Sequence, residues 1–134
     1  MKRIFCIIFT LVLCLLLLGC NEKDWDSVKM DNMIDSLVSC GFESQEYTDE
    51  QIIGIEVNFK MNPDHTLNDT ILRINHLIKP LNGGFEYVYI YLFETAEDAQ
   101  SILNTYAKYT SEYTKISDRV LAFGSSQDID ALRE

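Results

Sequence analysis

The histidines and the paired acids are the side chains of this chain that could bind a metal or transfer a proton. His65 and His76 are eleven residues apart. On one continuous helix they would share a face but lie about 16 Å apart along the axis. That separation is too large for one metal ion, so each histidine is expected to be solvated. Acidic pairs such as Glu97-Asp98 and Asp128-Asp130 stand at expected helix starts, where the helix dipole already explains them. The sequence therefore predicts no metal site.

The motifs of known catalytic centres are absent from the sequence. It contains no G-x-S-x-G, no H-E-x-x-H and no glycine-rich phosphate loop. The acids between Asp64 and Asp69 lack the glycine and the terminal glutamate of a calcium-binding loop. We therefore expect a protein that is not an enzyme, with no catalytic residues and no non-covalent cofactor.

Cys20 stands directly after an apolar segment that follows two cations. Lys2 and Arg3 precede residues 4–18, in which Thr10 is the only polar side chain. This is the order of a secretory signal. A helix of these fifteen residues would cover about 22 Å, which is short for a hydrocarbon core of about 30 Å. The segment is therefore expected to be an export signal that is removed.

The end of this segment, Leu17-Leu18-Gly19-Cys20, resembles the lipobox of bacterial lipoproteins. The resemblance implies that Cys20 receives a diacylglyceryl group and that a peptidase cuts after Gly19. It also allows an acyl chain such as palmitate on the new amino terminus. A thiolate can form the thioether, and two or three acyl chains hold a protein stably on a membrane. The alternative is a short membrane helix with an unmodified cysteine. The expected location is the extracytoplasmic face of the cell membrane, with residues 1–19 removed.

The chain that cleavage would leave is strongly acidic. It has 9 Lys and Arg against 21 Asp and Glu, a formal charge of −12. This charge disfavours nucleic acid as a partner and electrostatic docking onto anionic lipid. We expect the lipidated Cys20 and a short leader (20–25) to hold one α+β domain (26–134) off the membrane. Cys40 is the only other cysteine of that chain, so no internal disulfide is expected. We expect Cys40 to be a small buried thiol.

The hydrophobic pattern of residues 26–134 predicts alternating helices and strands. Gly41 followed by Phe42 is typical of a helix end. Residues 42–50 fit either a short edge strand or a loop. In sequence order we expect a helix over 26–40, a strand over 53–61, a helix over 68–79, a strand over 85–93, a helix over 95–109, strands over 113–117 and 120–123, and a short final helix over 125–132.

This order of elements indicates the α+β class. We expect a sheet of about four strands, mostly antiparallel or mixed, with the helices mainly on one face. The pattern broadly resembles the ferredoxin-like folds and the dimeric α+β sandwiches. An export signal with an acidic domain that ends in helix, hairpin and helix is also similar to small, uncharacterised surface lipoproteins of Gram-positive bacteria. That likeness implies no activity and no functional residue.

Two of the expected strands would combine into a polar and aromatic surface. If the odd residues of 53–61 face the helices, the even ones face away, and we expect the tyrosines of 85–93 on that same side. Three tyrosine hydroxyls in a row need partners or water, which favours a binding face. The alternative is that tyrosines suit a half-exposed sheet or pack under a loop. The candidate face comprises Glu56, Asn58, Lys60, Tyr87, Tyr89 and Tyr91, with Tyr113 and Lys115 as further members.

The sequence therefore predicts a membrane-anchored surface lipoprotein that is a non-enzymatic binding or interaction module. A protein partner or a second copy of the chain would dock on the sheet face. The alternative is a small acidic inhibitor or immunity-type lipoprotein, which would neutralise a basic toxin or hydrolase through its charge.

Overall fold

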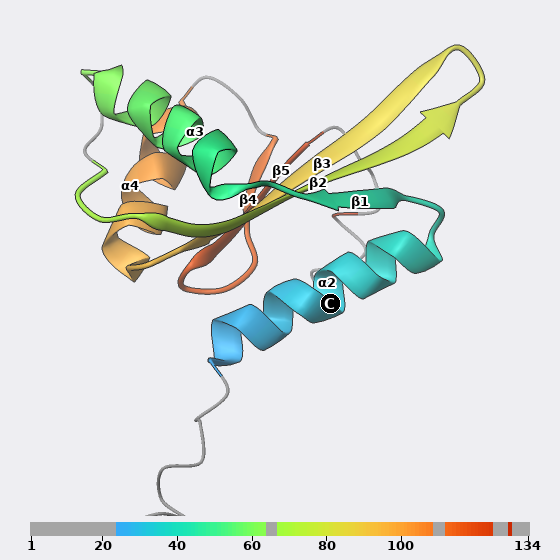
Figure 1. Ribbon diagram of the computed structural model, residues 1–134, viewed down its shortest axis with the longest axis horizontal. Helices are drawn as coiled ribbons and strands as arrows, with labels where there is room; N and C mark the ends of the chain where they lie inside the picture. The colour runs from blue at the N-terminus through green and yellow to red at the C-terminus, as the bar shows by residue number, and fades with distance from the viewer. Residues whose placement is uncertain (1–23, 64–66, 109–111, 125–128, 130–134) are drawn as a thin grey trace, which may run out of the picture.

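The computed structural model describes residues 24–63, 67–108, 112–124 and 129. Five strands form one antiparallel sheet in the order β1-β2-β3-β5-β4 (Figure 1). The α+β class is confirmed, with five strands rather than about four. The strands are β1 (Glu43–Glu46), β2 (Ile71–Leu81), β3 (Gly84–Phe93), β4 (Tyr113–Lys115) and β5 (Val120–Gly124), and the helices are α2 (Trp25–Ser39), α3 (Asp49–Met61) and α4 (Ala96–Tyr106).

The sheet carries helices on both of its faces. Helix α2 lies on one side, and α3 and α4 pack on the other (Figure 1). Two of the three described helices thus share a face, but α2 covers the opposite one, where we expected an open surface. Strands β1 and β2, which α3 joins, are direct neighbours. The sheet therefore lacks the strand that a split βαβ unit of a ferredoxin-like fold inserts between them.

Helix α2 has a capping side chain at its start and the predicted glycine at its end. Asp24 Oδ1 accepts a hydrogen bond from the backbone N–H of Asp26 at 3.2 Å. At the other end Gly41 has a φ of +95°, and the amide of Phe42 donates to the carbonyl of Leu37 at 3.1 Å. This is the Schellman arrangement, which glycine adopts without the steric cost of a Cβ. The first predicted helix is confirmed.

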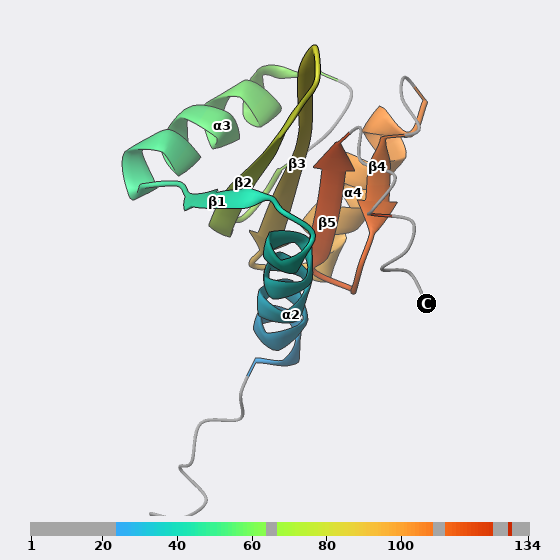
Figure 2. The ribbon, with the colours of Figure 1, turned by 90° about the vertical axis from the view of Figure 1, so that its right-hand side faces the viewer.

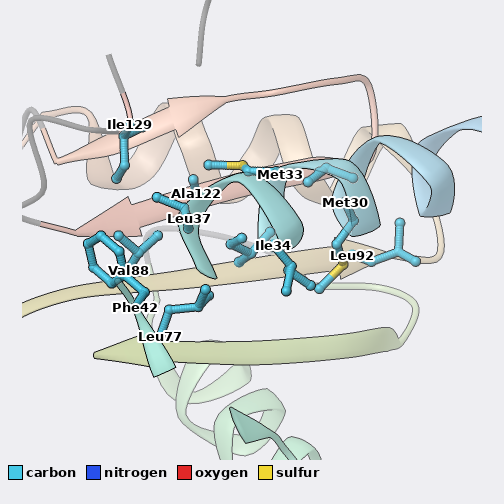
Figure 3. Packing of buried hydrophobic residues seen from close by; sticks show 12 residues of the cluster. Met30, Met33, Ile34, Leu37, Phe42, Leu77, Val88, Leu92, Ala122 and Ile129 are labelled. Atoms are coloured by element: carbon cyan, nitrogen blue, oxygen red, sulfur yellow. The ribbon is translucent and has the colours of Figure 1, made fainter. Parts of the chain in front are cut away.

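A cluster of apolar side chains fills the space between α2 and the sheet. In Figure 3 the labelled side chains of α2 point toward those of β2, β3 and β5. Met30, Leu37 and Leu77 are fully buried. The cluster consists of Met30, Met33, Ile34, Leu37, Phe42, Leu77, Val88, Ile90, Leu92, Val120, Ala122 and Ile129.

The segment predicted as a strand over 53–61 belongs to helix α3, so that prediction is wrong. Thr48 Oγ1 accepts from the amide of Gln51 at 3.4 Å, and Gln51 Oε1 accepts from the amide of Thr48 at 2.9 Å. This capping box starts the helix. Ile52 and Phe59, which are seven residues apart, face the sheet. Apolar residues also occur on the outer side of the helix and mimic the alternation of a strand: Ile53, Val57 and Met61.

The segment predicted as a helix over 68–79 lies mostly in β2, and that prediction is also wrong. Ile71 and Ile74 are three residues apart, yet both belong to the cluster under α3 and α4. The pairing with β3 shifts its register between Ile71 and Arg73. An irregularity of this kind inserts a residue and changes which face the next side chains occupy. Apolar residues on one face of the strand are therefore three residues apart at this point, which is the spacing typical of a helix.

The remaining elements agree with the predicted ones. Residues 42–50 form the short strand β1 and then the start of α3. The strand over 85–93, the helix after Thr95 and the hairpin of β4 and β5 are confirmed. The predicted final helix over 125–132 lies outside the described residues, apart from Ile129.

Candidate functional site

The polar half of the predicted binding face is not on a strand. Glu56, Asn58 and Lys60 lie on α3. Glu56 Oε1 accepts a hydrogen bond from the amide of Ile71 at 2.7 Å, so it joins α3 to the start of β2. Asn58 and Lys60 are exposed on the helix. These three residues therefore do not combine with the tyrosines into one sheet surface.

The tyrosine row, which we define as Tyr87, Tyr89 and Tyr91, faces α3 and α4 rather than the open side that we expected. Tyr91 is 7% exposed and packs against Phe59 of α3, with ring centroids 6.2 Å apart. Burial raises the pKa of the Tyr91 phenol far above its usual range. Tyr89 and Tyr87 are only half-buried. The row thus passes from core to surface along β3, because α3 covers one end of it.

The two further members of the predicted face also separate. Tyr113 stacks on Phe123 of β5 with centroids 4.5 Å apart, and burial raises the pKa of its phenol. Lys115 is exposed, and its Nζ lies 3.1 Å from Asp118 Oδ1. Tyr113 therefore belongs to the aromatic packing under α4, and Lys115 belongs to the surface of the β4–β5 hairpin.

From Tyr87, at the exposed end of the tyrosine row, β2 and β3 continue as a two-stranded hairpin arm, defined here as residues 79–87. The pairing of β1 with β2 ends at Ile78, and the pairing of β5 with β3 ends at Val88. Among the described residues, the arm pairs only within itself. Figures 1 and 2 show the arm projecting at the end of the molecule opposite the start of α2.

A groove of about 300 Å³ lies at the base of the hairpin arm. The strand register places Ile78 opposite Tyr87 and His76 opposite Tyr89, so all four side chains share one face. Phe85 stands two residues before Tyr87 on the same face, and its side chain is 71% exposed. The groove is lined by His76, Ile78, Phe85, Tyr87 and Tyr89.

The floor of the groove is a packed aromatic cluster. The rings of His76 and Tyr89 stack with centroids 4.2 Å apart, and Tyr47 packs edge-on against both rings at 6.3 Å. Burial lowers the pKa of His76, which keeps its imidazole neutral at pH 7. Burial and a hydrogen bond with Tyr47 raise the pKa of Tyr89. The groove therefore offers neutral ring faces and edges.

This arrangement suits binding better than acid–base chemistry. No carboxylate and no amine is among the five residues that line the groove. Ring faces and an aliphatic side chain bind apolar or aromatic groups by contact and stacking. Within the described ranges, no group of three or more His, Cys, Asp and Glu side chains could hold a metal ion.

Several predicted residues lie elsewhere or outside the described part of the chain. Cys40 is exposed at the end of α2, so the prediction of a buried thiol is wrong. Cys20, Gly19 and His65 lie outside the described residues. In the part of the chain that the structure describes, no helix is long and apolar enough to cross a membrane.

Tyr87 and Tyr89 were predicted from the sequence as members of a binding face, but the residues on the other side of the groove were not. His76 and Ile78 stood in a segment predicted as a helix, where they have no relation to the tyrosines. A signal was present, because Asn82-Gly83 between two apolar segments strongly favours a hairpin. A hairpin with that turn places His76 and Ile78 opposite the tyrosine row.

The chain matches no protein-family model, no curated protein and no solved structure.

Proposed function

We propose that this protein is a lipid-anchored, extracytoplasmic binding module without enzymatic activity, which holds a partner on the groove at the base of its hairpin arm. One observation carries the proposal: an apolar groove of about 300 Å³ lies where the aromatic face of the sheet extends beyond the helices. The lipobox-like sequence that ends at Cys20 supports the anchor.

The lining of the groove favours a partner that contributes an apolar or aromatic side chain. Phe85 projects from the arm with 71% of its side chain exposed, next to the half-buried Tyr87. Exposed aromatic side chains beside a pocket supply much of the binding energy in protein interfaces. The partner is therefore a protein segment, either of another protein or of a second copy of this chain.

The position of the arm supports display away from a membrane. Cys20 is four residues before Asp24, where α2 is capped, so a fully extended leader reaches about 14 Å. The start of α2 and the tip of the arm lie at opposite ends of the molecule (Figure 2). A lipid on Cys20 would hold the first end near the bilayer and leave the groove accessible to a partner.

Site-specific photo-crosslinking in intact cells tests this proposal. A photoreactive phenylalanine at position 85 should form adducts with the partner, since this side chain stands at the groove. The same probe at Met61, which is 76% exposed on α3, is the matched control. An adduct of twice the monomer mass would identify a second copy as the partner. Equal or absent adducts at the two positions contradict the proposal.

The acidic charge supports the alternative, an inhibitor or immunity-type lipoprotein. Strand β1 is fully exposed and carries Glu43 and Glu46, and α3 begins with Asp49 and Glu50. A basic toxin or hydrolase would meet this acidic edge. Its association rate should fall steeply with ionic strength, whereas binding at the aromatic groove should hardly respond. The salt dependence of association with the crosslinked partner distinguishes the two functions.

A further inference from the structure

The only tryptophan of the chain stands exposed at the end of the domain nearest to Cys20. Trp25 is the first residue of α2, and 69% of its surface is accessible to solvent. It follows Cys20 by five residues. In membrane proteins, tryptophan is enriched in the zone between lipid headgroups and hydrocarbon. There the ring is buried among the lipids and its N–H stays hydrated.

We infer that Trp25 inserts into the headgroup region of the same membrane that holds the lipid of Cys20. The inference rests on the proposed lipid anchor. Five residues span at most about 18 Å when fully extended. Trp25 is therefore confined to a thin layer above the bilayer, where contact with the headgroups is frequent. Insertion removes a large apolar ring from water without any further folding of the chain.

The charges around Trp25 allow this contact, although the chain as a whole is acidic. Arg119 Nε lies 2.9 Å from Asp26 Oδ2, and the Arg119 guanidinium also pairs with Asp24. Lys29 follows Trp25 by one helical turn, on the same side of α2. The two cations balance the two carboxylates, so the anchor end, which we define as these five residues, is formally neutral. An anionic bilayer repels it much less than it repels the rest of the domain.

Two arginines attach α2 to the sheet, so that contact at Trp25 orients the whole domain. Arg119 lies in the β4–β5 turn and binds the first turn of α2. Arg73 of β2 binds Asp31, with Nη1 and Oδ1 2.6 Å apart. The apolar cluster under α2 adds to this attachment. With Trp25 in the bilayer, the hairpin arm therefore points away from the membrane.

The fluorescence of Trp25 tests the inference directly, because no other tryptophan contributes. The lipidated protein is reconstituted into vesicles of phosphatidylethanolamine and phosphatidylglycerol. We expect blue-shifted emission, strong quenching by lipids brominated near the headgroup, and several-fold weaker quenching by iodide than in the unlipidated Cys20→Ala protein prepared without residues 1–19. Emission and iodide quenching equal to those of Cys20→Ala overturn the inference.

Flotation of the vesicles separates this inference from the proposed function. If the wild-type protein does not float with the vesicles, the anchor fails and the proposed function fails with it. If the protein floats but Trp25 remains accessible to iodide, only the inference fails. A blue shift that grows with protein density at a fixed lipid content indicates burial against a second copy, and it also overturns the inference.

A second reporter tests the orientation. In the Trp25→Phe, Phe85→Trp protein the only tryptophan stands on the hairpin arm. Its emission should remain accessible to iodide and insensitive to brominated lipid, because the arm points away from the bilayer. Lipid quenching at position 85 as strong as at position 25 overturns the proposed orientation.

Discussion

The imidazole ring of His76 lies flat against the phenol ring of Tyr89, with centroids 4.2 Å apart and an angle of 5° between the ring planes. The two residues are directly opposite each other on β2 and β3. Tyr89 also approaches Tyr47 and Phe123, each with centroids 6.3 Å away. The stacked pair thus forms the floor of the groove and is also part of the packing that joins the two central strands.

The stability of the protein should depend on the protonation of His76. Burial lowers the pKa of His76 in the folded state below its usual value of 6.5. Between the lowered value and 6.5 the unfolded state binds more protons, so stability falls as the pH drops through this window. Well above pH 6.5, His76 is neutral in both states and does not change the stability with pH. Urea unfolding at about pH 7.5 and about pH 5.5 measures this loss. His76→Phe keeps a ring on Tyr89 and should lose less stability on acidification. An equal loss in both proteins contradicts the assignment to His76.

Truncations of Tyr89 and Phe85 should have different effects. Tyr89→Ser removes the centre of the aromatic cluster and should lower the free energy of unfolding by about 2 kcal/mol, since the ring is half-buried. Phe85→Ser, on the exposed arm, should change it by less than about 0.5 kcal/mol while weakening the complex with the partner at the groove. Urea denaturation measures both free energies of unfolding, and co-purification with the partner measures the complex. A Phe85→Ser protein that unfolds as easily as Tyr89→Ser would show that the arm is structural.

Gly124→Ala should be strongly destabilising. A Cβ at this position would lie 2.1 Å from the carbonyl oxygen of Tyr87 and 2.9 Å from the Cα of Val88. Both atoms belong to the backbone of β3, so the strands must separate, and we expect a loss of about 3 kcal/mol. Gly54→Ala is the matched control, because nothing lies within 4 Å of its Cβ position in α3. It should stabilise the helix by roughly 0.5 to 1 kcal/mol. Equal thermal unfolding temperatures would contradict the close packing at Gly124.

Cys20→Ala should abolish lipid attachment. Without the thiol no thioether forms, so the protein should remain uncleaved or be released, and it should carry no label from an alkyne-tagged fatty acid. Cys40→Ser should be labelled like the wild type, because Cys40 lies outside the lipobox-like sequence. Wild-type protein in the culture fluid without residues 1–19 and without acyl mass on Cys20 would contradict the anchor.

The sequence predicted the elements that local contacts define. Gly41 marks the end of α2, and the Schellman hydrogen bonds at this end join only residues that are close in the sequence. Thr95 marks the start of α4 in the same way, since its Oγ1 accepts from the amide of Asp98 at 3.2 Å. The alternating aromatic residues of β3 need no distant partner to indicate a strand. Such features are visible without knowledge of the tertiary structure.

The wrong predictions concern segments whose secondary structure depends on contacts with residues far away in the sequence. The register shift between Ile71 and Arg73 gave β2 the spacing of a helix, and a shift of this kind exists only against the partner strand. In α3, the exposed Ile53 and Val57 completed an apparent alternation. The prediction of the candidate site was incomplete for the same reason. The tyrosine row was predicted, but its partners on β2 were assigned to a helix.

The edges of the sheet are unsuitable for the addition of further strands. One edge is β1, whose four residues are all exposed and include two glutamates. The other is β4, which has three residues. On the hairpin arm, Pro80 has no N–H to offer, and Lys79 pairs with Glu86 across the two strands at 4.0 Å. Short, charged or proline-containing edges prevent the growth of intermolecular sheets. Many copies can therefore lie close together at high local concentration without polymerising into fibrils.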